Sequence, residues 1–243
     1  MKTSKRTKIA FAVILSIIIV FVGGIYIYAS DYYRAEADAL SCIKYADTVT
    51  VTQSDGAYIF SPDKAECGLI FYPGGKVEYS AYAPLLSELA KENILCILIE
   101  MPLNLAVLNV DAATEYFDEF PEIDKWYIGG HSLGGSMAAS YASENSDKLD
   151  GLILLASYST ADLKASGLDV ISVYGSNDGV MNMEKYNEHR QNLPSSTVEK
   201  VIEGGSHAYF GSYGEQKNDG TPTVSRNEQI NETVKIITDT IRK

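Results

Sequence analysis

The sequence predicts an α/β fold: a doubly wound, mostly parallel sheet of about eight strands, preceded by an N-terminal transmembrane helix. From residue 48 onward, short β-rich runs alternate with amphipathic helical stretches, which is typical of a sheet covered by helices on both faces. Two of these runs, 94–99 (ILCILI) and 151–156 (GLILLA), are apolar throughout, as strands of a buried parallel sheet are. A separate run of 21 uncharged residues lies near the N-terminus.

The uncharged run covers residues 9–29 and, at ~1.5 Å per residue, is long enough to span the ~30 Å hydrocarbon core of a bilayer. Basic residues fill the tail 1–8 and acidic residues follow the run, so we expect a cytoplasmic tail and an external domain. A cleaved signal peptide ending at residues 27–29 is the alternative, although its apolar core would exceed the usual ~7–15 residues. That alternative also places the domain outside the cytoplasm, as a secreted protein. We expect an uncleaved anchor, then a linker over 30–47 and one folded domain over 48–243.

Composition narrows the class of protein. With 243 residues, of which 46% are apolar, the chain has enough material for one domain with a buried core. The net charge of -12 argues against nucleic acid and anionic lipid as main partners, because both require clustered Lys and Arg. Cys42, Cys67 and Cys96 lack the spacing of metal ligands, so we expect no metal site. Cys67 and Cys96 adjoin apolar runs and are expected to be buried free thiols, while the state of Cys42 and the oligomeric state stay open.

The same patterns place the individual elements. The expected strands are Thr48–Gln53, Ala57–Ser61, Gly68–Tyr72, Ile94–Glu100, Trp126–Gly129, Gly151–Ala156, Asp169–Tyr174 and Thr197–Ile202. The expected helices are Tyr79–Glu92, Ala112–Phe120, Leu133–Glu144, Met183–Leu193 and Arg226–Ile241. Ser225 followed by Glu228 is a capping box for the last helix. Residues 204–224, rich in Gly and Ser, form a loop of a length that is usually functional.

The strongest local signal is the motif Gly-x-Ser-x-Gly at residues 130–134, centred on Ser132. The motif follows a predicted strand and opens a predicted helix, and that context makes it specific. On such a turn the strained backbone raises the serine hydroxyl above the sheet, and the helix directs its N-terminal amides at the site. Ser132 is therefore the candidate nucleophile.

A serine hydroxyl needs an adjacent base to remove its proton. Of the three histidines, His131 is the variable residue of the motif and His189 lies in a polar helical stretch, which leaves His207, just after the last strand. The base needs an acid that holds its tautomer, and Asp178 follows the preceding strand. The resulting chain order of serine, aspartate and histidine is one that catalytic triads use. Asp162 is the alternative acid.

Two backbone N–H groups are expected to stabilise the negative charge that develops on the substrate oxygen, each worth ~10²–10³ in rate. One is the amide of Leu133, directly after the nucleophile. The other comes from the glycine turn after the strand GLIFY, where Gly75 is the first choice and Gly74 or Lys76 are alternatives. Gly74, Lys76 and Tyr209 are also expected to contact the substrate.

With these parts in place, residues 48–242 resemble the α/β-hydrolase superfamily and, more narrowly, a compact, capless bacterial group of α/β-hydrolase-fold proteins. The shared pieces are 71–77 (FYPGGKV), 82–90 (YAPLLSELA), 101–108 (MPLNLAVL), 129–135 (GGHSLGG) and 204–226. The resemblance implies the α/β-hydrolase fold, a catalytic domain over 48–243, the triad positions and a hydrolytic reaction. It implies no metal or organic cofactor. Larger relatives insert a lid where this chain has only 157–168 (SYSTADLKASGL), so we expect an open, shallow pocket that suits short acyl esters or accessible surface substrates better than long-chain lipids.

The expected function is hydrolysis of a small-molecule ester through an acyl-serine intermediate at the extracytoplasmic face of a membrane. Acyl transfer to another acceptor and amide hydrolysis use the same three residues, so both stay open. A catalytically silent binding domain is the alternative from a different class, since a fold alone does not fix a function. The complete triad and the glycines in both turns argue against it.

Overall fold

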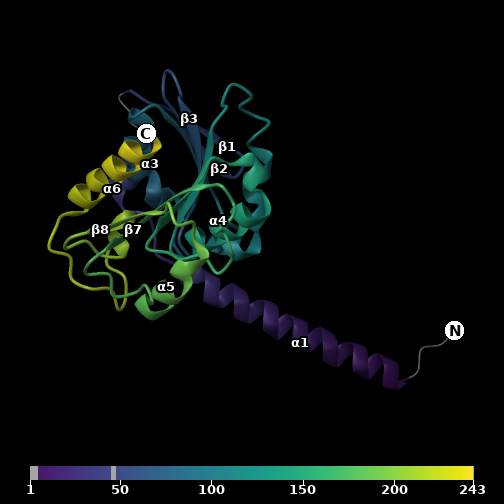
Figure 1. Cartoon of the computed structure of the whole chain (residues 1–243). Coiled ribbons are helices and arrows are strands. Elements are labelled where there is room, and N and C mark those ends of the chain that lie inside the picture. Colours follow the sequence, from purple (N-terminus) through teal and green to yellow (C-terminus); the bar gives the residue numbers. More distant parts are fainter. Residues whose placement is uncertain (1–4, 45–47, 243) are drawn as a thin grey trace.

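An eight-stranded sheet forms the centre of the domain (Figure 1). The structure is a computed structural model that describes residues 5–44 and 48–242. In the sheet the strands lie in the order β1-β2-β4-β3-β5-β6-β7-β8. Their bounds are β1 Thr50–Ser54, β2 Ala57–Ser61, β3 Cys67–Tyr72, β4 Ile94–Ile99, β5 Trp126–His131, β6 Gly151–Leu155, β7 Asp169–Gly175 and β8 Val198–Ile202. All eight predicted strands are confirmed.

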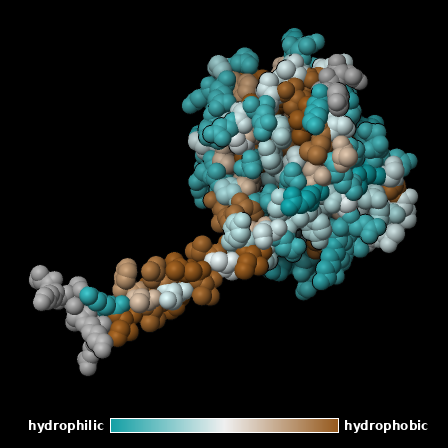
Figure 2. All heavy atoms as spheres, turned by 180° about the vertical axis from the view of Figure 1, so that it is seen from behind, coloured by the Kyte–Doolittle hydropathy of each residue, from teal (hydrophilic) through white to brown (hydrophobic). Residues whose placement is uncertain are grey.

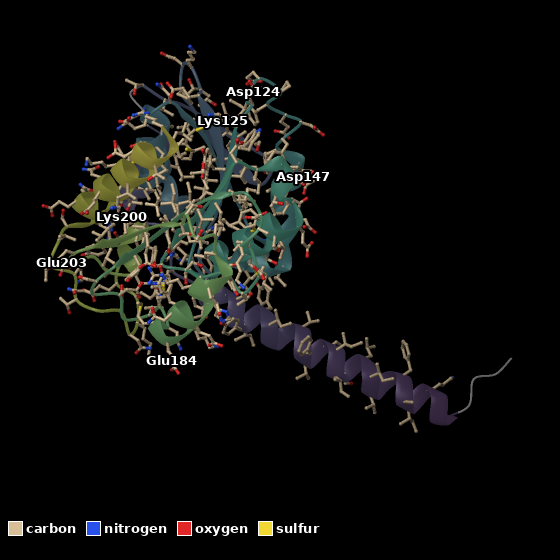
Figure 3. All side chains as sticks on the ribbon, in the orientation of Figure 1. Asp124, Lys125, Asp147, Glu184, Lys200 and Glu203 are labelled. Atoms are coloured by element: carbon tan, nitrogen blue, oxygen red, sulfur yellow. The ribbon has the colours of Figure 1, made fainter. Side chains whose placement is uncertain are left out.

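The strands β3 to β8 run parallel, and β1 and β2 form a hairpin that joins β4 antiparallel. Because parallel strands end at the same edge of a sheet, the segments after β3, β5, β7 and β8 meet there. These four segments carry every residue that the sequence predicts for the site. Asp124 and Lys125, which precede β5, lie at the opposite end of the domain (Figure 3).

Helices cover both faces of the sheet, as predicted (Figure 1). On one face, α3 (Ala83–Lys91) and α6 (Arg226–Ile241) share a core with side chains such as Leu86 and Ile230. On the other face, α4 (Leu133–Glu144) packs through small residues such as Ala138 into a second core. The predicted capping box of α6 is present, with Ser225 and Glu228 bonded to each other's backbone N–H. Further along the chain, α5 (Met183–His189) follows β7.

The α-helix predicted over 112–120 is wrong: the segment begins as a 3-10 helix, η4 (Val110–Glu115), and continues in turns. The hydroxyl of Tyr72 on β3 donates to the carbonyl of Val110 at 2.7 Å and accepts the N–H of Ala113 at 2.9 Å. Val110 and Ala113 both belong to η4, so these two bonds hold the 3-10 helix against the end of β3. A buried tertiary contact therefore overrides the local helical pattern.

Other short segments are 3-10 helices that connect the larger elements. Two of them shorten predicted α-helices, because Tyr79–Tyr82 precedes α3 and Arg190–Asn192 follows α5. The remaining ones are η2 Pro102–Asn104, η3 Ala106–Leu108, η5 Ser146–Lys148 and η7 Ala208–Phe210. The residues between β6 and β7, where a lid was not expected, form bends and turns only.

Helix α1 (Lys5–Ser30) contains the predicted span 9–29 and projects away from the domain (Figure 1). Its surface is almost entirely hydrophobic (Figure 2). An 18-residue window within Lys8–Ser30 has a mean hydropathy of 2.8, and by length and composition the helix fits a membrane anchor or a signal sequence. Residues 1–4 of the predicted basic tail lie outside the described residues.

The segment 31–44, predicted as a linker, lies against the domain. Tyr33 pairs with Val77 as in a parallel sheet: its N–H donates to the carbonyl of Lys76 and its carbonyl accepts the N–H of Glu78, both at 2.8 Å. Helix α2 (Ala37–Lys44) follows and packs on α3. Arg226 at the start of α6 forms an ion pair with Glu36 at 2.7 Å. Residues 45–47, the end of the predicted linker, lie outside the described residues.

The three cysteines are free thiols. Cys67 and Cys96 are buried, as predicted, and Cys42 is half-buried. Burial raises the pKa of the Cys67 thiol to about 11 and raises the pKa of Cys96 well above its usual range. Neither buried thiol is therefore a reactive thiolate at neutral pH.

Candidate active site

Ser132 lies on the tight turn between β5 and α4. Its backbone angles are φ 52° and ψ -121°, a conformation that side-chain-bearing residues rarely adopt. Two hydrogen bonds from the end of β6 hold it: the Ser132 N–H donates to the carbonyl of Leu155 at 2.9 Å, and the Ser157 hydroxyl donates to the Ser132 carbonyl at 2.7 Å. This is the strained strand-to-helix turn that the motif predicts.

A glycine in this turn allows α4 to begin directly on the end of β3. A Cβ atom on Gly134 would overlap the carbonyl oxygens of Tyr72 and Pro73. No side chain is therefore tolerated at this position without moving the backbone. The close approach places the N-terminus of α4, with its unpaired amides, beside the loop that follows β3.

Asp178 and His207 meet in the interior, from the loops after β7 and β8. Nδ1–H of His207 donates to Oδ2 of Asp178 at 2.8 Å, and both side chains are only 1% exposed. The other carboxylate oxygen of Asp178 accepts the N–H groups of Val180 and Met181, each at 2.8 Å. With the proton on Nδ1, Nε2 of His207 keeps the lone pair that a general base needs.

Nε2 of His207 is buried and has no hydrogen-bond partner in the described part of the chain. The imidazole ring of His207 lies 4.5 Å, centroid to centroid, from the ring of His131, the residue before the nucleophile. Ser132 itself is partly exposed. The structure therefore joins the candidate acid to the candidate base by a hydrogen bond and places the turn of Ser132 beside His207. Within the described residues it contains no hydrogen bond between Ser132 and His207.

The alternative acid and the third histidine lie apart from this pair. The Asp162 side chain is 66% exposed and pairs with Lys164 at 3.5 Å. His189 stacks on Tyr158 with ring centroids 5.3 Å apart. Neither side chain contacts Asp178 or His207 among the interactions of the described residues.

Two residues that the sequence reading missed hold the loop of His207. Asp219 accepts the N–H groups of His207 at 3.1 Å and Ala208 at 2.8 Å, and it also accepts the N–H of Gly179, next to the acid, at 3.1 Å. Gln229 on α6 is buried and forms two hydrogen bonds with the backbone of Ser206. One carboxylate thus ties the acid loop to the base loop. No local pattern marks either residue, because each acts on a partner more than ten positions away.

The three candidate oxyanion donors after β3 differ in whether their backbone N–H already has an acceptor. The N–H of Gly74 donates to the Tyr82 hydroxyl at 3.0 Å, and the N–H of Lys76 donates to the carbonyl of Asn104 at 2.8 Å. The N–H of Gly75 has no acceptor among the described residues. A Cβ on Gly75 would lie 2.8 Å from Cδ2 of Leu133, so the two residues that carry the predicted donors are neighbours.

His131 lies behind the nucleophile in a buried hydrogen-bonded chain. The Tyr82 hydroxyl, which accepts the N–H of Gly74, is hydrogen-bonded to Nδ1 of His131 at 2.8 Å. Burial, and secondly the nearby His207, hold the pKa of His131 well below its usual range. His131 is therefore neutral at physiological pH and connects the glycine turn to the end of β5.

Two other residues that were predicted to contact the substrate are Tyr209 and Lys76. Tyr209 lines a cavity of about 170 Å3 beside the His207 loop, together with Ala208 and Asp219. The Lys76 side chain instead turns toward the end of α1, with Nζ 3.2 Å from Asp31 and 4.5 Å from the centroid of the Tyr28 ring. Substrate contact by Gly74, Lys76 and Tyr209 stays a prediction.

Comparisons with known proteins bear on the whole domain. The model of the alpha/beta hydrolase family matches residues 68–231, more than half of the chain. No curated protein matches.

Solved structures resemble the fold at low sequence identity. Est1E from Butyrivibrio proteoclasticus has a TM-score of 0.58 at 13% identity, with 81% of this chain and 100% of that chain covered. TT1662 from Thermus thermophilus has a TM-score of 0.59 at 12% identity, with coverage of 80% and 99%. A third structure, from work on carboxylesterases of Nitrososphaera gargenis, has a TM-score of 0.51 at 15% identity, with coverage of 67% and 92%.

Proposed function

The chain belongs to the alpha/beta hydrolase family, and from that premise we propose that it is a serine hydrolase that cleaves small acyl esters at the extracytoplasmic face of a membrane. Ser132 is the nucleophile, His207 the general base and acid, and Asp178 the residue that orients the base. The observation that carries the proposal is the buried hydrogen bond between Asp178 and His207, beside a serine on a strained strand-to-helix turn.

The reaction proceeds in two steps. Nε2 of His207 takes the proton of the Ser132 hydroxyl as the serine oxygen attacks the ester carbonyl carbon. The bond between that carbon and the alcohol oxygen then breaks, and Nε2–H returns the proton to the departing alcohol. In the second step Nε2 takes a proton from water, the resulting hydroxide attacks the acyl group, and Ser132 regains its proton as the carboxylic acid leaves.

The amides of Leu133 and Gly75 stabilise both tetrahedral intermediates. Gly75 lies against the Leu133 side chain, and the Gly75 amide has no acceptor among the described residues. Asp178 accepts the Nδ1 proton, so the imidazolium formed in each step lies beside a carboxylate. A short acyl group is favoured because residues 157–168 form only bends and turns and supply no helix to enclose a long chain.

Labelling with a fluorophosphonate probe tests the nucleophile. We expect the wild-type chain to be labelled and Ser132→Ala to lose the label completely. Ser140→Ala is the matched control, because Ser140 is partly exposed two turns along the same helix, and its labelling should equal that of the wild type. A label that persists in Ser132→Ala rejects Ser132, and a wild-type chain that is never labelled favours the binding domain.

The external location is tested on intact cells. Protease added outside should remove the domain while leaving a cytoplasmic marker protein intact. Protection of the domain until the cells are lysed would place it inside and contradict the proposal.

A further inference from the structure

We infer that the edge of the domain that carries Gly75 rests on the bilayer surface beside α1. The substrate is then an ester group of an amphiphile that is embedded in this bilayer. The chemistry of this inference rests on the proposed function, whereas the membrane contact does not. The inference is carried by the way the end of α1 is joined to the site.

Residues 31–33 connect α1 directly to the loop after β3. This loop carries Gly75 and is called the oxyanion loop below. α1 ends at Ser30, and Tyr33 is hydrogen-bonded on both sides to the backbone of Lys76 and Glu78. Three residues of extended chain reach at most ~10 Å, so the loop that carries Gly75 lies within about that distance of the end of the helix. A helix that crosses a bilayer ends at the headgroup region, and the oxyanion loop must then lie just above it.

Side-chain contacts hold this junction in one orientation. The Lys76 ammonium lies 3.2 Å from Asp31 and 4.5 Å from the centroid of the Tyr28 ring, so one cation contacts both the end of α1 and the residue after it. The 3-10 helix η2 packs against α1. Tyr26 and Tyr28 are exposed at this end of the helix, where an interfacial aromatic belt lies.

An exposed apolar ledge, formed by Leu103, Val107 and Leu108, lies on the same side of the domain. These side chains are 42%, 53% and 52% exposed and belong to η2 and η3, the segment after β4. Residue Asn104 in the ledge segment accepts the N–H of Lys76, so the ledge is tied to the oxyanion loop. Figure 2 shows hydrophobic surface on the domain next to the point where α1 joins it.

The bilayer is the occupant that this arrangement favours. The ledge adjoins a helix long enough to cross a membrane, so its apolar side chains reach the interface with no further partner. The chain has a net charge of -12 and Asp31 at the junction is exposed, which favours zwitterionic over anionic headgroups. An ester at the bilayer surface would thus meet the Gly75 amide without leaving the lipid.

Membrane contact is tested first, without reference to activity. Full-length Val107→Cys, in a Cys42→Ser background, is labelled with bimane and placed in phosphatidylcholine nanodiscs that carry a spin-labelled lipid. We expect strong quenching at position 107 and weak quenching for the matched control Val201→Cys. Val201 is 44% exposed on β8, the edge strand that lies four positions from β3 in the sheet. Equal weak quenching at both positions would overturn the inference, as would a label at 107 shielded from lipid and aqueous quenchers alike, because protein would then cover the ledge.

Substrate presentation is tested with two butyrate esters that share one coumarin leaving group. One ester is soluble, and the other carries a hexadecyl chain on the coumarin that seats it in the nanodisc. We expect Val107→Glu and Leu108→Glu to lower kcat/KM on the seated ester about tenfold and to leave the soluble ester within about twofold. Val201→Glu should change neither rate. The inference that the bilayer presents the substrate would be overturned if the ledge variants kept the wild-type ratio of kcat/KM on the seated ester to kcat/KM on the soluble ester. Hydrolysis of neither ester by the wild type would reject the proposed function, while the quenching result would still decide the membrane contact.

Discussion

The backbone of Ser132 is the most strained feature of the site. A side-chain-bearing residue at φ 52° and ψ -121° costs on the order of 1–3 kcal/mol. The hydrogen bonds to Leu155 and from Ser157 offset this cost and keep the hydroxyl side chain at the carboxyl edge of the sheet. Under the proposed function this strain serves the reaction, because a nucleophile must stand clear of the strand that carries it.

Asp178 is expected to matter through the tautomer of His207. In Asp178→Asn the amide NH2 can face Nδ1, which favours the proton on Nε2 and removes the base. We expect kcat to fall by ~10³–10⁴ with a small change in KM. Steady-state hydrolysis of p-nitrophenyl butyrate measures both values. Asp162→Asn, at the exposed alternative acid, is the control and should retain wild-type kcat. The reverse ranking of the two variants would assign the acid to Asp162.

His131 is expected to make folding stability depend on pH. Its native pKa lies well below its usual range because of burial, so below about pH 6.5 the unfolded chain binds a proton that the native chain does not. Stability is therefore complete above pH 6.5 and falls as the pH falls, by at most ~1.4 kcal/mol per pH unit for this one group. His131→Gln removes the titration and should flatten the slope between pH 6.5 and 5. Urea unfolding across that range measures it, and an unchanged slope would contradict the assignment.

At the scale of elements, the site depends on contacts between loops. The loops after β7 and β8 are joined by Asp219, and the loop after β3 is joined to the end of β5 through Tyr82 and His131. Each loop contributes one part of the reaction, so the relative placement of the loops decides whether the parts act together.

Asp219→Asn tests that placement. The amide has the same shape but only one acceptor oxygen, so the N–H of His207 or of Ala208 loses its partner. We expect the free energy of unfolding to fall by ~1–3 kcal/mol and kcat to fall about tenfold, since the base moves relative to the nucleophile. Chemical denaturation and ester hydrolysis measure the two effects. Asp147→Asn, at an exposed position in η5 just after α4, should change neither, and an Asp219→Asn variant of full activity would remove Asp219 from the account.

Local patterns in the sequence were sufficient for the strands and for α4 and α6. The apolar runs of β4 and β6 have only one suitable environment, and Ser225 with Glu228 marks the start of α6. The segment 112–120 was mispredicted because it begins within a 3-10 helix that is hydrogen-bonded to Tyr72, some 40 positions earlier in the chain. Asp219 and Gln229 were missed for the same reason. The chain order of the three candidate residues follows from the fold. The residues that hold their loops in place act through long-range contacts, which leave no local pattern in the sequence.

At the scale of the whole molecule, residues 31–44 connect the anchor to the site. Besides the pairing of Tyr33 with Val77, the ring of Tyr33 lies 5.6 Å from that of Tyr213 in the loop after β8, and Glu36 pairs with Arg226. The segment therefore touches both the oxyanion loop and the loop of the base.

Two truncations separate the anchor from this segment. A chain that begins at Ser30 keeps these contacts and should hydrolyse a soluble ester within about twofold of the full-length rate. A chain that begins at Val49 loses them, and we expect a lower Tm and about a tenfold lower kcat, because Lys76, Glu78 and Arg226 lose partners. Thermal unfolding and hydrolysis of p-nitrophenyl butyrate measure both effects. Equal stability and activity of the two chains would show that 31–44 is a passive linker.

The acyl-enzyme itself gives the most direct test of the account. The full-length chain is mixed with a butyrate ester, quenched in acid within the first turnover, digested and examined by mass spectrometry. We predict one butyryl group on the peptide that contains Ser132, formed in the wild type and in Ser140→Ala but not in Ser132→Ala or His207→Ala. Turnover without that adduct, or the adduct on another side chain, would contradict the account.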